Sequence, residues 1–435
     1  MNVNDMRSTT YIILFFMLGF SWMLPLQGRV ICFFLLILFY CVDNVVFGEG
    51  RVNKLTIIFG AFLLTILTHL AVTNLYELVR FNYVPFHSVY RNSGIRSTLG
   101  LIFNTTWIYI IANILLKYAR DGLLIRAFAS GFNIFTIILL CHLPSLLVDI
   151  HGTRLSFVLQ EDGHPLNPNL LAYTFMLFFY LNFLASFYTD RILVKAYHWL
   201  FCAVNVVFII MTMSRAIFVA LLIGLVCLLF FQRKLFFTLI FVALLFGFYT
   251  MVFDKDFLSV LPIPERLIDV NRAIEGGGAG RTDVWMDYFT YASLREYLLG
   301  VGYGSSAQEI LYQKPLRYWA SSASGIISPM LLRILSPHNT YFEAFLKYGI
   351  IGLCIYLYLL CFLGKKIIRR AMSESTVSRI YLAIFVSFVL RGMFEDSNII
   401  SLMFISLLMS HALQPSNVVL DFSRGDVDEA RIDYA

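Results

Sequence analysis

Three side chains of this 435-residue sequence have the chemistry to bind a diphosphate and activate a hydroxyl group. Arg215 lies in TMSRAIFVALL at the start of an apolar run, Arg281 follows the glycine-rich stretch GGGAG, and His338 lies in SPHNTYF just before another apolar run. A guanidinium offers phosphate oxygens a planar, permanently charged fork, and a histidine titrates near neutral pH and can accept a hydroxyl proton. We predict that these three side chains form a catalytic site. The predicted substrate-binding residues are Arg215, Arg281, Asn339 and Trp285.

Each of the three also has a purely structural interpretation. Arg215 could extend its charged end to a membrane interface while its aliphatic part stays among apolar side chains. Arg281 could be a solvated loop residue, and His338 could cap a helix that begins at residue 340. Each residue alone is a weak signal, so the prediction depends on all three lying on one face of the protein.

The composition predicts a membrane protein. The chain is 59% hydrophobic and 14% charged and contains 42 Phe, and apolar runs recur along it. Many of these runs have about 17 to 25 residues, the length that a helix needs to cross a bilayer. A soluble chain of this size would carry more surface charge. We predict an all-α integral membrane protein with about 12 transmembrane helices, at residues 10–24, 30–47, 55–76, 100–117, 124–147, 169–188, 194–213, 216–231, 235–253, 340–363, 380–394 and 397–413.

The basic residues predict the orientation. They gather in one set of alternate connections, which the positive-inside rule places in the cytoplasm with both termini. These residues are Arg51, Lys54, Lys117, Arg120, Arg126, Arg191, Lys195, Arg233, Lys234, the KKIIRR run at 365–370 and Arg379. The net charge of +6 is therefore mostly topogenic and gives no reason to expect a nucleic acid partner.

The opposite connections are then extracytoplasmic. They include 77–99, 148–168, the tight turn at Ser214–Arg215 and one long loop, about 254–339, between the ninth and tenth helices. A loop of this length is more than a connector, and it contains or borders all the candidate site residues except Arg215. We predict a single polytopic membrane domain at 1–420, followed by a polar cytoplasmic tail at 421–435.

Motifs for metal or nucleotide chemistry are weak. DKD (254–256) has the carboxylate spacing of a metal site, but a solvated helix end explains it better. GGGAGR (276–281) lacks the Gly-Lys-Ser/Thr of a phosphate-binding loop, and no histidine pair has metal-binding spacing on a helix. We therefore predict no cofactor and no metal.

Five sequence pieces resemble the O-antigen ligase family, whose superfamily also includes O-antigen and exopolysaccharide polymerases. They are NPNLLAY (167–173), TMSRAIF (212–218), GRTDVW (280–285), LLGVGYGS (298–305) and PHNTYFEAFLKYGIIG (337–352). They span about 167–360 in the family's order, and the last piece is the most specific. Ala216 departs from the pattern, because family members often have Gly after Ser-Arg.

The resemblance implies a metal-independent, inverting glycosyltransferase. The donor would be a glycan linked through diphosphate to undecaprenol, and the acceptor lipid A-core or a lipid-linked glycan. Arg215 and Arg281 would hold the diphosphate as leaving group, while His338 would orient or deprotonate the acceptor hydroxyl. His338 would head the tenth helix, and Gly349 and Gly352 would let that helix pack closely against a neighbour. The protein would lie in the bacterial inner membrane with its site facing the periplasm, among membrane lipids and other polysaccharide-assembly proteins.

Three functions remain open at this point. A ligase would transfer the glycan to lipid A-core in lipopolysaccharide assembly, whereas a polymerase would transfer it to a lipid-linked repeat unit. A polysaccharide or lipid transporter or flippase is the third alternative. Transporters place ionisable residues mid-membrane and carry inverted repeats. The charges here lie at span ends, which favours glycan transfer.

Overall fold

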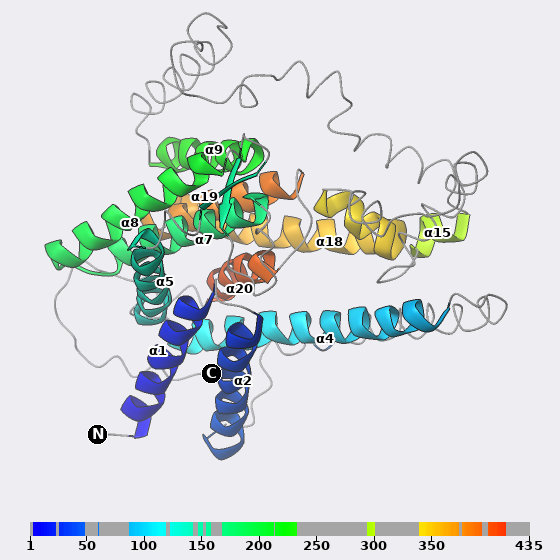
Figure 1. Ribbon diagram of the computed structural model, residues 1–435, viewed down its shortest axis with the longest axis horizontal. Helices are drawn as coiled ribbons and strands as arrows, with labels where there is room; N and C mark the ends of the chain where they lie inside the picture. Colours follow the sequence, from blue (N-terminus) through cyan, green and yellow to red (C-terminus); the bar gives the residue numbers. More distant parts are fainter. Residues whose placement is uncertain are drawn as a thin grey trace, which may run out of the picture.

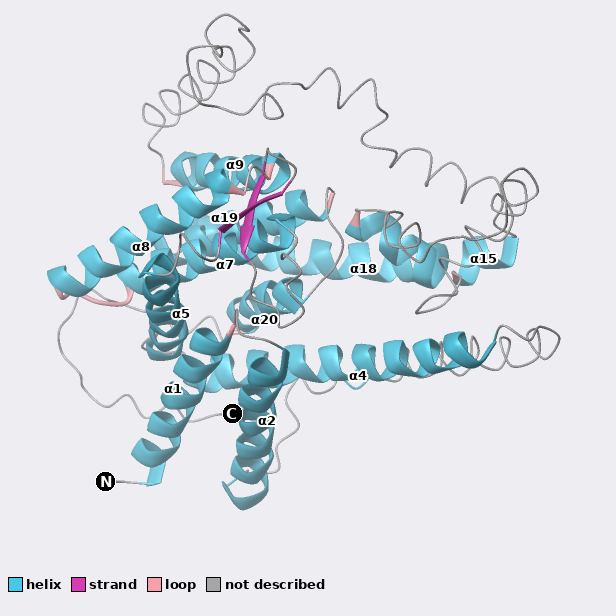
Figure 2. Cartoon of the chain, viewed as in Figure 1, coloured by secondary structure: helices cyan, strands magenta, loops and turns pink. Residues whose placement is uncertain are grey.

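The computed structural model describes the chain mainly as helices (Figures 1 and 2). The described residues are 3–22, 26–47, 60, 87–118, 122–141, 147–150, 154–157, 168–212, 214–232, 294–300, 339–373, 376–393 and 399–414. The helices are α1 (Val3–Ser21), α2 (Leu26–Phe47), α4 (His87–Tyr118), α5 (Leu123–Cys141), α7 (Pro168–Phe187), α8 (Ile192–Met211), α9 (Arg215–Phe231), α15 (Leu294–Leu299), α18 (Thr340–Ser373), α19 (Thr376–Gly392) and α20 (Ile399–Leu413).

The helices agree with most of the predicted membrane spans. Each predicted span coincides with a described helix except those at 55–76 and 235–253, which lie outside the described residues apart from Gly60. Four described helices are long and apolar enough to cross a membrane: Leu123–Cys141, Pro168–Phe187, Ile192–Met211 and Thr340–Met372. The total of 12 spans and the place of the long loop stay predictions.

The described residues are mainly helical, as the all-α prediction expects, but they also contain one short strand pair that was not predicted. Strands β1 (Leu147–Ile150) and β2 (Arg154–Phe157) form an antiparallel hairpin in which Leu147 pairs with Phe157 and Ile150 with Arg154. This segment was expected to be a plain extracytoplasmic loop. Its Leu, Val, Ile and Phe residues suit a two-stranded ladder, which pairs the backbone groups of a short connection internally.

Helix α19 lies among four antiparallel neighbours, α7, α9, α18 and α20. The Ser387 hydroxyl donates to the carbonyl of Ala220 on α9 (2.8 Å) and lies 2.6 Å from the Tyr180 hydroxyl on α7. On α20 the ring of His411 stacks on Tyr381 with centroids 4.0 Å apart. The C-terminal end of α19 therefore lies close to the N-terminal ends of four helices.

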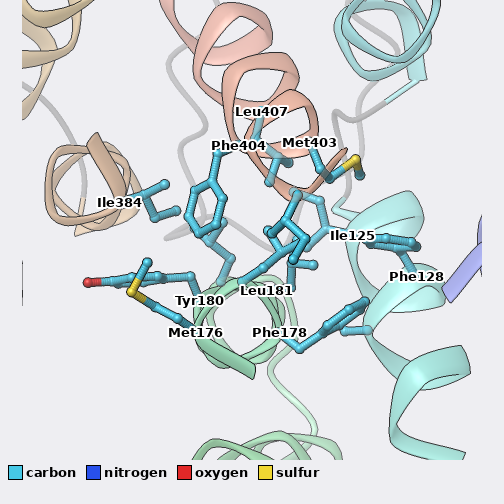
Figure 3. Packing of buried hydrophobic residues seen from close by; sticks show 14 of the residues in the cluster. Ile125, Phe128, Met176, Phe178, Tyr180, Leu181, Ile384, Met403, Phe404 and Leu407 are labelled. Carbon is cyan, nitrogen blue, oxygen red and sulfur yellow. The ribbon is translucent and has the colours of Figure 1, made fainter. Parts of the chain in front are cut away.

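The core is rich in aromatic side chains. Figure 3 shows Phe178 and Leu181 of α7 packed between residues of α5 and α20. Phe132 of α5 stacks on Phe178 with ring centroids 3.6 Å apart, and Tyr173 of α7 stacks on Phe404 of α20 at 5.1 Å. Helix α7 is buried on nearly all its faces, because it packs against α5, α8, α9, α19 and α20.

A polar network joins α7 to α5 and α8 inside this core. Asn133 and Asn182 exchange two amide hydrogen bonds of 2.7 and 2.9 Å, and His198 Nδ1 lies 2.8 Å from the Asn182 Oδ1 atom. All three side chains are buried. Paired amides satisfy each other in an apolar interior, so this network fixes the register of the three helices.

Charged residues join the helix ends that the basic-residue pattern assigns to the cytoplasm. Asp43 of α2 pairs with Arg7 of α1, and its other oxygen lies 3.8 Å from Lys117 of α4. Arg370 near the end of α18 donates to the carbonyls of His411 and Gln414 at the end of α20. These contacts group together ends that were predicted to share one side of the membrane.

Candidate functional site

The candidate site lies at the C-terminal end of α19, where α18 begins. The Asn339 side-chain amide donates to the carbonyl of Met393, just after the end of α19, at 3.1 Å. Two residues further on, the Tyr341 hydroxyl donates to the carbonyl of Val389 at 2.8 Å. The start of α18 is thus attached to the last turn of α19 by two hydrogen bonds.

Asn339 is also the N-cap of α18. Its Oδ1 atom accepts the backbone N–H of Tyr341 (3.0 Å) and of Phe342 (2.9 Å), and its carbonyl accepts the N–H of Glu343 (2.8 Å). Asparagine is among the preferred residues at this position. The capping role that the structural interpretation gave to His338 therefore belongs to its neighbour. Whether Asn339 also binds substrate stays a prediction.

Helix α18 is not the straight helix predicted for 340–363, because the chain folds back at Gly349. This residue has φ 66° and ψ −168°, a region that essentially only glycine adopts. The rings of Tyr341 and Tyr356 lie 5.8 Å apart, whereas residues fifteen positions apart in a straight helix are separated by about 22 Å. Residues 340–348 therefore lead away from the end of α19, and the chain returns beside them.

The fold-back brings two of the quoted sequence pieces together. A Cβ on Gly349 would overlap the backbone of Leu298 in α15, and one on Gly300 (φ 77°) would overlap the backbone of Lys347. The close packing expected at Gly349 is therefore present, against α15 (Figure 1). At Gly352 it is not: the space for a Cβ there is filled by Tyr348 of the same helix.

Arg215 begins α9 at the same end of α19. The Ala220 carbonyl accepts from Ser387, and a Cβ on Gly224 would lie 2.9 Å from the Ala383 carbonyl, so α9 runs antiparallel to α19. Five residues of helix span about 7.5 Å along the axis. This is the distance from Ala220 back to Arg215 on α9, and also the distance from Ser387 forward to Gly392 on α19. Arg215 therefore starts its helix level with the last residue of α19, where Asn339 is also bound.

The N-cap of α9 has unused hydrogen-bonding capacity. Ser214 precedes the helix in extended conformation and makes no side-chain cap bond. The residue is 3% exposed, and its Oγ atom is buried without a hydrogen-bond partner. The first N–H groups of a helix also lack partners within it. The start of α9 thus presents hydrogen-bond donors, a suitable arrangement for an anion.

A third arginine, which the sequence reasoning missed, lies at the same end. Arg391, in the last turn of α19, is 2% exposed. Its guanidinium carbon lies 3.9 Å from the centroid of the Tyr173 ring on α7, and its Nη1 atom donates to Ser401 Oγ on α20 at 3.0 Å. The signal for it was an Arg-Gly pair that closes an apolar run on the predicted outer side.

The remaining candidates are not described by the structure. Arg281, Trp285 and His338 lie outside the described residues, as does DKD (254–256), and of Arg215 only the backbone is described. Among the described residues there is no group of three potential metal ligands. The structure therefore brings the start of Arg215's helix and Asn339 to one end of α19, and the proximity of the other candidates stays a prediction.

Comparison with known proteins bears on this region. Residues 200–357 match the family model described as O-Antigen ligase. The match covers four of the five quoted pieces and confirms the family resemblance over this part of the chain; NPNLLAY (167–173) lies outside it. No curated protein and no solved structure matches the chain.

Proposed function

We propose, from the O-antigen ligase region at residues 200–357, that this protein is a membrane glycosyltransferase of surface polysaccharide assembly. It transfers a glycan from undecaprenyl diphosphate to a hydroxyl group of lipid A-core. The observation that carries the proposal is that this one region contains the helix starts at Arg215 and Asn339, which lie at the same end of α19.

The start of α9 binds the donor diphosphate in this proposal. A diphosphate carries several negatively charged oxygens, which need both charge and directed donors in a membrane setting. Arg215 supplies the charge, and the buried Ser214 hydroxyl and the first N–H groups of α9 supply donors. Arg281 supplies the second guanidinium from the long loop.

His338 acts on the acceptor. It takes the proton of the acceptor hydroxyl while that oxygen attacks the anomeric carbon. The bond from the anomeric carbon to the phosphate oxygen breaks, and undecaprenyl diphosphate leaves with the electron pair. A single displacement inverts the configuration at this carbon. The arginines offset the charge that develops on the leaving group, so the reaction needs no metal ion.

The inner membrane and its periplasmic face are the proposed location. The positive-inside rule gives this orientation. The contacts among Arg7, Asp43 and Lys117 agree with it in one respect, because they join ends that the rule assigns to the same, cytoplasmic side. The end of α19 then faces the periplasm, where lipid-linked glycans and lipid A-core meet.

The test uses the purified protein in lipid nanodiscs with an undecaprenyl-diphosphate-linked glycan donor. With lipid A-core as acceptor, we expect one glycan to be added to each core, visible as a mass shift of the acceptor. With only lipid-linked repeat units present, the proposed ligase should make no longer chains. Elongated lipid-linked products would identify a polymerase, which uses the same donor, and the absence of transfer to either acceptor would contradict the glycosyltransferase proposal.

A further inference from the structure

We propose that Arg391 is a positioning residue that holds the start of α18, and with it His338, in the place required for catalysis. The first half of this inference concerns only the described helix ends. The second half, the effect on catalysis, rests on the function proposed above.

Arg391 fixes the last turn of α19 to two other helices. A buried guanidinium is costly unless its charge and its N–H groups are compensated. Tyr173 compensates the charge by placing its ring face 3.9 Å from the guanidinium carbon, and Ser401 accepts an N–H at 3.0 Å. Tyr173 belongs to α7 and Ser401 to α20, two helices that also contact each other, so Arg391 ties the end of α19 to both of them.

The residues on either side of Arg391 hold α18. Two positions before it, the Val389 carbonyl accepts the Tyr341 hydroxyl at 2.8 Å. Two positions after it, the Met393 carbonyl accepts the Asn339 amide at 3.1 Å. The Tyr341 ring also packs against Gly392, where a Cβ would lie 3.3 Å from it. The turn anchored by Arg391 therefore carries both acceptors that position the start of α18.

His338 directly precedes the residue held by Met393. A shift of this turn would move Asn339, and His338 would move with it relative to the start of α9. Misplacing a catalytic group by about 1 Å reduces a rate by about 100-fold. Arg391 would thus affect the reaction through the position of His338, without contact to the substrate.

Arg370 provides the matched control. It joins α18 to the C-terminal end of α20, where it donates to the carbonyls of His411 and Gln414. Arg391, in contrast, joins α19 to the N-terminal end of α20. A loss of either arginine should therefore weaken the packing of α20. A loss of Arg370 should leave the start of α18 in place.

The experiment compares Arg391→Met, Arg391→Lys and Arg370→Met in nanodiscs. The first readout is hydrogen exchange of a peptide covering residues 338–345, which contains the N–H groups bound by Asn339. We expect faster exchange in Arg391→Met and unchanged exchange in Arg370→Met. The second readout is transfer per folded molecule: Arg391→Met should lower kcat by about 10- to 100-fold with little change in the KM for the donor. Arg391→Lys keeps the charge without the fork and should lie between the wild type and Arg391→Met.

Milder variants cover the case in which Arg391→Met does not fold. Ser401→Ala removes one bond and Tyr173→Leu removes the ring, and each should produce the same two effects at smaller size. Unchanged exchange in all folded variants would overturn the inference, whatever the activity. Faster exchange with a normal kcat would overturn its catalytic half. If the wild type transfers no glycan but exchange still depends on Arg391, the proposed function fails while the positioning of α18 stands.

Discussion

The two ends of α20 are each held by an arginine, but the arginines use different partners. Arg370 donates to backbone carbonyls of the last turn of α20 and just beyond it, where the helix dipole favours a cation. Arg391 donates to a serine hydroxyl in the first turn of α20, where the same dipole disfavours a cation. The contact of Arg370, at the inner end, predicted to face the cytoplasm, is an ordinary helix cap. The contact of Arg391, at the outer end, predicted to face the periplasm, requires a tyrosine ring and the C-terminal end of α19 to offset its cost. The outer end therefore has an arrangement that stability alone does not favour, as expected if this end works in catalysis and the inner end is structural.

The largest effect should come from His338 at the outer end. His338→Ala removes the proposed base, and we expect transfer to fall by about 100- to 10,000-fold. Because Asn339 provides the helix cap, the substitution should leave the unfolding temperature nearly unchanged. Donor binding should also be retained, since the proposal assigns the diphosphate to the arginines. Transfer at wild-type rate from equal amounts of membrane protein would remove His338 from the site.

A second test compares arginine-to-lysine changes at the two ends. Arg215→Lys and Arg281→Lys keep the charge but lose the planar fork. Losing one charge-assisted hydrogen bond costs about 1.5 to 3 kcal/mol, so transfer should fall by about 10- to 100-fold. Arg370→Lys at the inner end is the control and should leave transfer unchanged. Equal effects of all three substitutions, measured per folded molecule, would erase the distinction between the ends.

The fold-back at Gly349 offers a stability test. Gly349→Ala places a Cβ in a conformation reserved for glycine, at a cost of about 1 to 3 kcal/mol, and against the backbone of Leu298. The control is Gly364→Ala on the same helix, where the Cβ would meet only the tip of the Phe385 ring at 2.9 Å. Thermal unfolding should separate the two variants by several degrees. A tolerated Gly349→Ala would argue that α18 can run straight.

The smallest expected effect is that of metal removal. The proposed diphosphate site uses guanidinium and helix donors in place of a cation, so incubation with EDTA should leave the transfer rate unchanged. The measurement is initial rate before and after chelation, with added Mg²⁺ or Mn²⁺ as the second arm. Activity that disappears with EDTA and returns with Mg²⁺ would restore DKD (254–256) as a candidate metal site.

The sequence predicted the helices well because apolar runs of bilayer length are a strong signal. It also placed the helix starts of Arg215 and Asn339, because both follow turn residues at the edge of such runs. The fold-back was not predictable in the same way. The pattern Gly-x-x-Gly is compatible both with close packing of two helices and with a turn that has a positive φ. Only the contacts of Gly349 and Gly352 distinguish these two structures.

Side-chain partners were harder to predict than helices. Asn339 directly precedes the first helical residue, a position where asparagine is a preferred cap. The neighbouring His338 was nevertheless considered as the cap. Arg391 lies near the end of the predicted helix 380–394 and was given no role, because its partners Tyr173 and Ser401 are brought to it only by the packing of α7 and α20. The hairpin at 147–157 has only four residues in each strand, too few for a clear alternation pattern.

The position of α19 among α7, α9, α18 and α20 also sets the order in which the molecule can be completed. Ribosomes make α7 and α9 before α19, which follows the whole of the family-matched region at 200–357. A nascent chain that has reached residue 375 already contains both helix starts of the candidate site, but the helix that holds Asn339 level with Arg215 has yet to be made. The site is therefore complete only after α19 has inserted beside α7, α9 and α18, which precede it in the chain, and α20, which follows it, has supplied Ser401 to Arg391.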